Sequence, residues 1–148
     1  MKRQRRKESR RATETNHIIS KTIVTTAERT SRGIALEDLT GIRERVKAKK
    51  DQRYRLHSWA FAQLGAFVEY KAQRAGVPLV HVDPRNTSRQ CSVCWHTHRQ
   101  NRVDQATFAC RSCGVTMHAD INGSRNIRHR AADAWKRGAV NAPTSTLT

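Results

Sequence analysis

Four cysteines, arranged as two C-x-x-C pairs, are the residues whose spacing most directly indicates chemistry. Cys91 and Cys94 form the first pair, Cys110 and Cys113 the second, and fifteen residues separate the pairs. Each pair can form a tight knuckle that points two thiolates at one ion, and this spacing is typical of zinc sites. Two disulfides or four unrelated buried thiols are the alternatives. Because the protein would fill all four coordination positions, the predicted zinc is structural.

Two acidic residues stand where a carboxylate could bind a metal. Glu37 follows the apolar run Ile34–Leu36, which predicts a short buried strand that ends in acids. Active sites gather at such strand ends in open sheets, although this segment alone favours the start of a polar turn. Asp120 precedes a helical pattern, and its residue type alone favours a helix N-cap over a metal ligand. We expect that helix to carry Ile121, Ser124 and Ile127 along one side.

The order of these motifs resembles the C-terminal zinc-ribbon region of the OrfB/TnpB proteins of insertion sequences. The matching pattern is C-x-x-C, a loop, C-x-x-C-G and then H-A-D-x-N-x-x-x-N-I. The segment GIALEDLTGIR, from Gly33, is similar to the second motif of their RuvC-like domain, and D-P-x-x-T-S, from Asp83, to their lead-in to the ribbon. The resemblance covers about Asn16 to Ala132.

This resemblance implies an RNA-guided DNA nuclease, related to type V CRISPR effectors, in which three carboxylates hold two Mg²⁺ ions. Glu37 and Asp120 match the second and third carboxylates. Two such ions activate a water and stabilise the leaving oxygen of a phosphodiester. Asp38 matches a neighbour without a catalytic role. Trp95 stands where the family has Gly, so we expect the first knuckle to follow a different backbone path.

The first of the three carboxylates has no match. The acids before Glu37 are Glu8, Glu14 and Glu28, and none lies on an apolar strand. We therefore expect the C-terminal part of a TnpB-like protein, inactive alone, whose partner is a missing N-terminal half or a second copy. Whether the chain is an enzyme stays open. The alternatives are a stand-alone zinc-ribbon module that binds nucleic acid without catalysis, and a ribbon used for protein contact.

The charge of the chain predicts a polyanionic partner. Twenty-nine Lys and Arg stand against twelve Asp and Glu, which gives a net charge of +17 spread along the sequence. DNA is the expected partner, with guide RNA implied by the resemblance. The candidate phosphate contacts are Arg85, Arg89, Arg99 and Arg102. With no run of 18 apolar residues we expect no membrane span, and cysteines grouped for metal fit a reducing, cytoplasmic location.

The expected fold class is α/β (α+β), an incomplete RNase H/RuvC-like domain with an inserted four-cysteine zinc ribbon. The predicted segments are residues 1–15, basic and either disordered or a truncated helix; 16–86, a partial RuvC-like part; 87–117, the ribbon; 118–135, a C-terminal helix; and 136–148, a disordered tail. Within 16–86 we predict a helix from Asn16 to Thr30 with Asn16 as N-cap. A mobile basic connector is expected over 43–55. A helix over 56–76, with core residues such as Phe67 and Val68, and a strand over 77–83 should follow.

Overall fold

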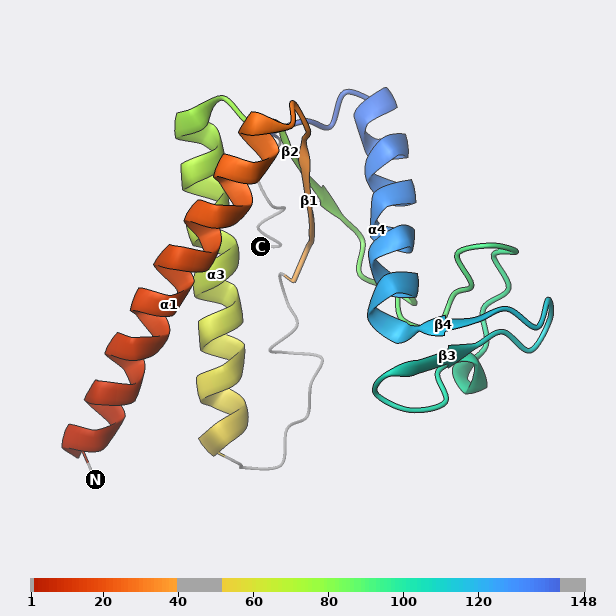
Figure 1. Cartoon of the computed structure of the whole chain (residues 1–148), viewed down its shortest axis with the longest axis horizontal. Coiled ribbons are helices and arrows are strands. Elements are labelled where there is room, and N and C mark those ends of the chain that lie inside the picture. Colours follow the sequence, from red (N-terminus) through yellow and green to blue (C-terminus); the bar gives the residue numbers. More distant parts are fainter. Residues whose placement is uncertain (1, 40–51, 142–148) are drawn as a thin grey trace, which may run out of the picture. The chain divides into compact units, whose positions relative to one another are not determined.

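A computed structural model describes residues 2–39 and 52–141, and the side chains of 6–39 and 60–141 (Figure 1). Helices and strands are mixed, as predicted. In chain order the elements are α1 (Lys2–Arg29), β1 (Ile34–Glu37), α3 (Gln52–Ala75), β2 (Leu79–Val82), the 3₁₀ helix η1 (Arg99–Asn101), β3 (Thr107–Ala109), β4 (Thr116–His118) and α4 (Ala119–Lys136). The chain forms two compact units, one built on α1 and α3 and the other, within the described residues, on 35–38 and 80–141.

The first unit is a pair of packed helices, α1 and α3. Val24 and Ala27 of α1 and Val68 and Ala72 of α3 are buried. Small and β-branched side chains let two helix backbones approach closely, and packing offsets the weak helix propensity of the Thr- and Ile-rich α1. The prediction that Val68 lies in a core is confirmed, while Phe67 is half-buried and stacks on His17 with ring centroids 4.0 Å apart.

The predicted start of the first helix is wrong. α1 begins at Lys2, so of the two alternatives for residues 1–15 the structure has the helix, and Asn16 lies in its interior. Asn16 is buried, and its Nδ2 donates to the carbonyl of Ala60 at 2.8 Å and to Gln63 Oε1 at 3.1 Å. Its role is therefore to bind the neighbouring helix. α3 also begins before the predicted position, at Gln52. Residues 52–55 are therefore helical and do not belong to the predicted connector. The rest of that connector, residues 43–51, lies outside the described part.

The two predicted strands are confirmed as β1 and β2, which pair with each other. The Ile34 N–H donates to the Pro78 carbonyl and the Asp38 N–H to the Val82 carbonyl, each at 2.8 Å. Since both partners advance by four residues, the strands run in the same direction. Parallel strands bury both faces, which explains the apolar character of β2. Glu37 is the last residue of β1, at the carboxyl end of the pair.

The second unit is held by a small core and by α4. Phe108 of β3 and Ala119 of α4 are buried beside Cys91 and Cys110. β3 and β4 form an antiparallel hairpin in which Phe108 faces Met117. α4 has the predicted length but begins and ends one residue later than predicted, and residues 137–141 follow it within the described part of the predicted tail. Residues 142–148 lie outside the described part.

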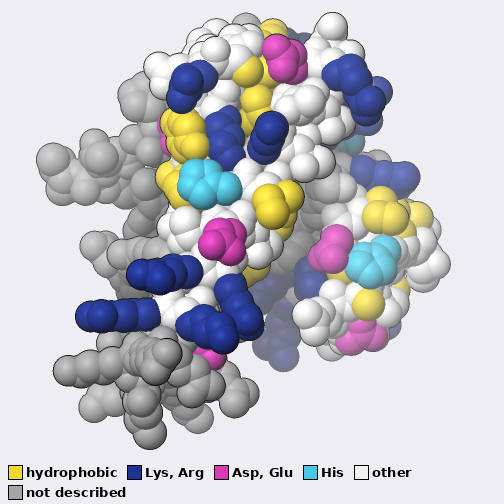
Figure 2. All heavy atoms as spheres, turned by 60° about the vertical axis from the view of Figure 1, so that its left-hand side comes forward, with side chains coloured by type: hydrophobic (Ala, Val, Ile, Leu, Met, Phe, Trp, Pro, Cys, Tyr) yellow, Lys and Arg dark blue, Asp and Glu magenta, His cyan; other side chains and the backbone are white. Residues whose placement is uncertain are grey.

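The surface carries the excess positive charge of the sequence. In Figure 2, Lys and Arg side chains are distributed across the face shown instead of gathering at one end. Some apolar side chains are exposed as well, among them Ile18 and Phe61. Among the described helices, none is both long and apolar enough to cross a membrane.

Candidate metal centre

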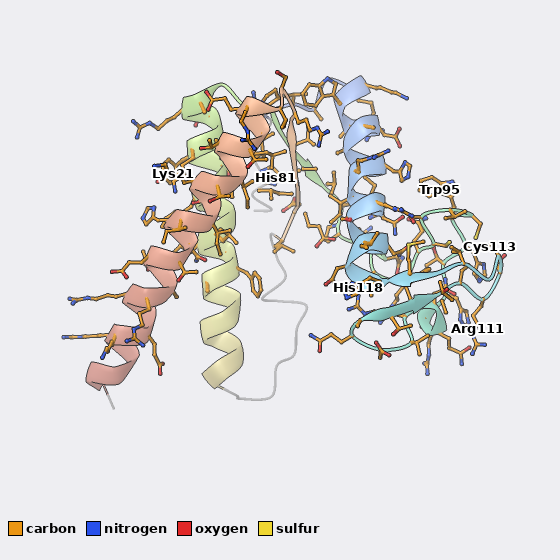
Figure 3. All side chains as sticks on the ribbon, viewed as in Figure 1. Lys21, His81, Trp95, Arg111, Cys113 and His118 are labelled. Atoms are coloured by element: carbon orange, nitrogen blue, oxygen red, sulfur yellow. The ribbon has the colours of Figure 1, made fainter. Side chains whose placement is uncertain are left out.

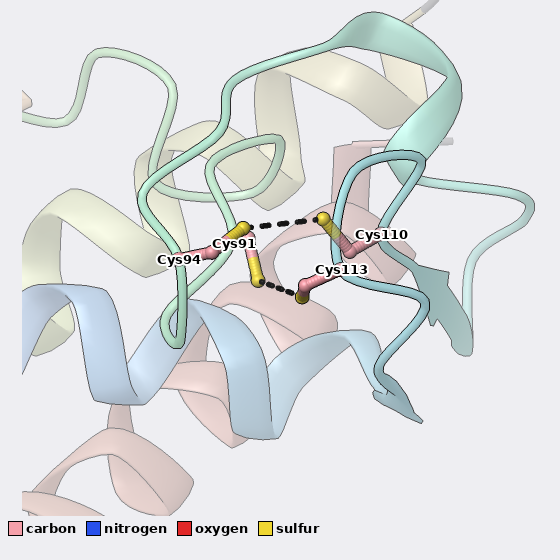
Figure 4. Close-up of side chains that lie close together, drawn as sticks. All are labelled: Cys91, Cys94, Cys110 and Cys113. Atoms are coloured by element: carbon pink, nitrogen blue, oxygen red, sulfur yellow. Dashed lines mark hydrogen bonds between the residues drawn. The ribbon is translucent and has the colours of Figure 1, made fainter.

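The four cysteine sulfurs lie together in the second unit (Figure 4). All four sulfur atoms lie within 4.8 Å of one another. Cys91 and Cys113 are 3.8 Å apart and Cys94 and Cys110 are 3.5 Å apart, so the close pairs join one knuckle to the other. None of the four forms a disulfide. The alternatives of two disulfides or of four unrelated thiols are therefore wrong.

The two knuckles have the same backbone geometry. In the first, the Cys91 N–H donates to the His96 carbonyl at 2.9 Å and the Cys91 carbonyl accepts from Trp95 at 3.0 Å. In the second, the Cys110 N–H donates to the Val115 carbonyl at 2.9 Å, and the Cys110 carbonyl accepts from the Gly114 N–H at 3.1 Å. Gly114 thus takes the place that Trp95 has in the first knuckle. The sulfur of the first cysteine in each knuckle also accepts a backbone N–H two residues later, at 3.4 Å. Such N–H donors stabilise a thiolate, which is the form that binds metal.

Trp95 follows the same path as the glycine of the other knuckle, so the predicted change of path is wrong. Its φ is 66°, beside 73° for Gly114. This left-handed conformation costs an ordinary L-residue about 1–2 kcal/mol. The Trp95 ring packs edge-on against His129 of α4, with centroids 4.9 Å apart, although half of the residue is exposed. Figure 3 shows Trp95 and Cys113 on the loops of this unit and His118 at the start of α4.

The thiols differ in how readily they ionise. Burial disfavours the Cys110 thiolate, but the N–H groups of Cys113 and Ser112 and the Cys94 side chain outweigh it and lower the Cys110 pKa to about 6. The Val115 N–H favours the Cys113 thiolate, but burial and the neighbouring thiols outweigh it and raise the pKa of Cys113 to about 12. Packed thiolates repel one another, and a divalent cation between them would relieve that repulsion.

The sulfur geometry fits a tetrahedral ion. With Zn–S bonds of about 2.3 Å, tetrahedral sulfurs lie about 3.8 Å apart, close to the 3.8 and 3.5 Å separations of the cross-knuckle pairs. Among the described residues, this is the one group of three or more His, Cys, Asp or Glu side chains close enough to share an ion. His96 and His98 are not in it. They stack on each other, and His98 Nδ1 caps η1 by accepting from the Gln100 N–H at 3.3 Å.

Three buried asparagines hold the knuckles in place; two of them, Asn122 and Asn126, stand in the H-A-D-x-N-x-x-x-N-I pattern, but no role was predicted for any of the three. The first, Asn101, donates to the His96 carbonyl at 3.1 Å and accepts from the Arg111 N–H at 2.9 Å, which ties one knuckle to the other. The second, Asn122 of α4, accepts from the Ser92 N–H at 2.9 Å and donates to the Gln90 carbonyl at 2.8 Å. It therefore binds the backbone on both sides of the first cysteine.

The third, Asn126, lies one turn further along α4. Its Nδ2 donates to the carbonyls of Gln90 at 2.7 Å and Thr87 at 2.8 Å. Like Asn122, it is fully buried. On the side predicted to carry Ile121, Ser124 and Ile127, Ile121 is half-exposed and Ser124 is exposed, so the buried face of this helix is the one that carries the two asparagines. Two asparagines four residues apart, where a helix would favour apolar residues, are the signal that could have found this face.

Glu37 is half-buried and hydrogen-bonded. Its Oε1 accepts from the Thr87 hydroxyl at 2.6 Å, a short distance that is typical of a charge-assisted bond. Thr87 is buried, and its hydroxyl oxygen also lies 3.1 Å from the Pro84 carbonyl. The carboxylate therefore has a fixed partner on one oxygen.

Asp120 is not the N-cap of α4. That position belongs to His118, whose Nδ1 accepts from the Asp120 N–H at 3.2 Å, and Asp120 is the second helical residue. Its side chain is 81% exposed and its Oδ2 lies 3.8 Å from His118 Nδ1. An acid in the first helical turn interacts favourably with the helix dipole. Exposure also leaves the carboxylate accessible to an ion.

The four candidate arginines lie in the second unit. Arg85, Arg89 and Arg99 are exposed, and the Arg85 Nε lies 3.9 Å from an exposed Asp83 carboxylate, a weak surface pair. Arg102 is half-buried, and its Nη2 donates to the Gln105 carbonyl at 2.8 Å. Arg102 is thus partly committed to its own loop, while the other three guanidinium groups are open to solvent.

Comparison with known proteins identifies the family. The family model described as the Cas12f1-like TNB domain matches residues 61–127. The chain is 40% identical over 114 residues to the CRISPR-associated endodeoxyribonuclease Cas12f1 of Sulfoacidibacillus thermotolerans, a match that covers 76% of this chain and 26% of the relative. It is 32% identical over 142 residues to a TnpB-like protein of Methanocaldococcus jannaschii, which covers 95% of this chain and 49% of the relative.

The fold is similar to that of a chain in a solved structure. A Cas12f1–sgRNA–target DNA complex contains a chain of the same fold, with a TM-score of 0.62, 23% identity and coverage of 82% of this chain and 34% of that one. The present chain belongs to the TnpB/Cas12f type of protein. It spans about half, or less, of the length of these two curated relatives.

Proposed function

We propose that this chain is the zinc-binding and DNA-binding part of an RNA-guided, Mg²⁺-dependent DNA endonuclease. The proposal is carried by one observation: the four clustered sulfurs, Glu37 and Asp120 all belong to the same compact unit of a TnpB/Cas12f-type chain. The similar Cas12f1 structure is a complex with an sgRNA and target DNA. Guide RNA and DNA are accordingly the partners proposed for this chain, and its +17 charge suits both.

Zinc is the proposed occupant of the cysteine site. Four thiolates at tetrahedral distances suit an ion that accepts soft ligands without redox chemistry. With no coordination position left for water or substrate, its role is to hold the two knuckles together. The site is then structural, and it supports the surface that carries Arg85, Arg89 and Arg99.

Glu37 and Asp120 are the proposed Mg²⁺ ligands. When bound, the ions activate a water and stabilise the leaving oxygen. Thr87 engages one oxygen of the Glu37 carboxylate, and Asp120 is exposed at the first turn of α4. Within the described residues no three carboxylates lie close enough to share an ion, and Glu8, Glu14 and Glu28 are exposed on α1. We propose that a third carboxylate comes from a polypeptide outside these 148 residues, and that the chain alone does not cleave.

The second candidate function is a zinc-dependent nucleic-acid-binding module without catalysis. The same lack of a three-carboxylate group in the described part favours it. Both candidates predict DNA binding that weakens steeply with salt, because binding releases counterions. They differ in whether DNA is cleaved once a third carboxylate is supplied by another polypeptide.

The deciding experiment is complementation. The zinc-loaded chain is mixed with the part of the Methanocaldococcus jannaschii relative that lies outside the match, a nucleic-acid extract and Mg²⁺, and cleavage of supercoiled plasmid is followed. The nuclease proposal expects cleavage in the mixture only, lost with Glu37→Gln or Asp120→Asn while DNA binding persists. Cleavage that survives Asp120→Asn would contradict the assignment of that carboxylate. Binding lost in a Cys110→Ser, Cys113→Ser variant, with no cleavage in any mixture, would support the binding module.

A further inference from the structure

A continuous series of hydrogen bonds connects the first knuckle with Glu37. It runs from the Ser92 N–H to Asn122, from Asn122 and Asn126 to the Gln90 carbonyl, and from Asn126 to the Thr87 carbonyl. The Thr87 hydroxyl then reaches Glu37. Every residue in the series belongs to the second unit.

The orientation of these bonds is fixed by chemistry. Both partners of Asn126 Nδ2 are carbonyl oxygens, which only accept, so the amide must turn its NH₂ group toward them. Its two hydrogens are thereby used, one on each carbonyl. The Gln90 carbonyl accepts from Asn122 and from Asn126, which uses both of its lone pairs. Three hydrogen bonds thus converge on the carbonyls of Thr87 and Gln90 and restrain the backbone from Thr87 to Ser92, although the buried Oδ1 atom of Asn126 itself has no hydrogen-bond partner among the described residues.

The Thr87 hydroxyl has a choice of acceptors. It has one hydrogen, and two oxygens lie within reach: Glu37 Oε1 at 2.6 Å and the Pro84 carbonyl at 3.1 Å. The bond to an ionised carboxylate is the shorter and the stronger one. It fixes the rotation of the Glu37 carboxylate and leaves the second oxygen, Oε2, available to a cation.

We propose that Thr87 is a positioning residue for Glu37, and that Asn122 and Asn126 link its placement to the metal-bearing first knuckle. The inference rests on the proposed function for the role of Glu37 as a Mg²⁺ ligand. Partners that orient a metal ligand change metal affinity about 10- to 100-fold when they are removed. A filled cysteine site would thus hold the carboxylate in its metal-binding orientation without touching Mg²⁺.

The test compares four substitutions in the full zinc-loaded chain, three at threonines and Asn126→Ala. Thr87→Val removes the hydroxyl at nearly constant shape, Thr87→Ser keeps it, and Thr116→Val makes the same change at an exposed position of β4. Two quantities are measured by NMR. One is the ¹³C signal of the Glu37 carboxyl group, which reports the hydrogen bond without any added ion. The other is the Mn²⁺ concentration that half-broadens the amide signals of residues 35–38.

The expected result is a displaced Glu37 carboxyl signal and a roughly tenfold higher Mn²⁺ midpoint in Thr87→Val. Thr87→Ser and Thr116→Val should stay within about twofold of the wild type, because they keep the bond. Asn126→Ala, at full zinc content, should displace the carboxyl signal in the direction of Thr87→Val. Zinc content measured on each variant separates these effects from a loss of the knuckles.

Two other outcomes are decisive. If Thr87→Val leaves both the carboxyl signal and the Mn²⁺ midpoint unchanged, Thr87 does not position Glu37 and the inference is overturned. If the carboxyl signal moves as expected but Mn²⁺ never broadens residues 35–38 in the wild type, the hydrogen-bonded link stands. In that case it is the proposed metal-binding role of Glu37 that fails.

Discussion

Trp95 and Gly114 occupy equivalent positions in the two knuckles and share one left-handed backbone conformation. Their φ angles are 66° and 73°, and each donates its N–H to the carbonyl of the first cysteine of its knuckle, at 3.0 and 3.1 Å. The hydrogen-bonded geometry of the knuckle therefore requires this conformation whatever the side chain. A glycine adopts it without cost, while a tryptophan adopts it under strain.

Gly114→Ala should lower the free energy of unfolding by about 1 kcal/mol. No atom lies within 4 Å of the added Cβ, so the cost is conformational and not steric. Gly123→Ala, in the interior of α4, is the matched control. It also meets no atom within 4 Å, and there it should stabilise by about 0.5–1 kcal/mol because alanine favours the helix. Urea unfolding of the zinc-loaded proteins measures both, and equal signs would contradict the explanation.

Trp95→Gly and Trp95→Ala should differ in stability. Both lose the edge-on contact with His129, worth about 0.5–1.5 kcal/mol. Only the glycine also relieves the left-handed strain of about 1–2 kcal/mol. We therefore expect Trp95→Gly to unfold near the wild-type urea concentration and Trp95→Ala below it, with about 1 kcal/mol between the variants. An alanine variant as stable as the glycine variant would show that the backbone at this position is not strained.

Removal of metal should open the second unit. Structural zinc contributes about 10–16 kcal/mol in apparent binding free energy, which is comparable with the whole stability of a domain. After treatment with a chelator, hydrogen exchange should speed up across residues 91–118, whereas the buried helix contacts of Val68 and Ala72 do not depend on the cysteines. Cobalt added in place of zinc should give the absorption of a tetrahedral thiolate site, at one ion per chain. A chain that keeps its ribbon protection without metal would refute a structural role for the ion.

Asp104 should make the stability of the ribbon depend on pH in the acid range. The Thr107 and Ala106 N–H groups, each 2.7 Å from its Oδ1, hold the pKa of Asp104 below its usual 3.8. Since the folded-state pKa is the lower one, the stabilisation is complete above pH 3.8 and disappears as the pH falls through the lowered pKa. Asp104→Asn should thus be less stable than the wild type near neutral pH, and the difference should shrink in acid. A difference that stays constant down to about pH 2 would contradict this account.

Asn16→Ala should destabilise the pair of helices α1 and α3. It leaves the half-buried Gln63 side chain and the Ala60 carbonyl each without one donor, at a cost of about 1–3 kcal/mol. Thr22→Ala is the control on the same helix. Its hydroxyl is exposed and bonds only to the Ile18 carbonyl, so alanine should be neutral or slightly stabilising. Thermal unfolding followed by far-UV circular dichroism compares the two.

Residue type and local spacing were enough to predict which residues are chemically special. Two C-x-x-C pairs at the right separation predicted four sulfurs around one ion, because the tight turn of each knuckle points both of its thiols toward the same place. Apolar runs that end in Glu37 and Asp83 predicted β1 and β2, and apolar residues at helical spacing predicted α3. These features depend on contacts between residues close in the chain, so local spacing suffices.

Which polar residues are buried could not be predicted in this way, because it depends on contacts between distant parts of the chain. Asn122 and Asn126 displaced the apolar side of α4 from the interior because their amides satisfy backbone groups 30 or more residues away. Asn16 became a helix contact and His118 the cap of α4, although an asparagine and an aspartate are the commoner caps. The contribution of a buried polar side chain to stability depends on which distant donor or acceptor it binds. Residue type and local spacing do not predict that partner.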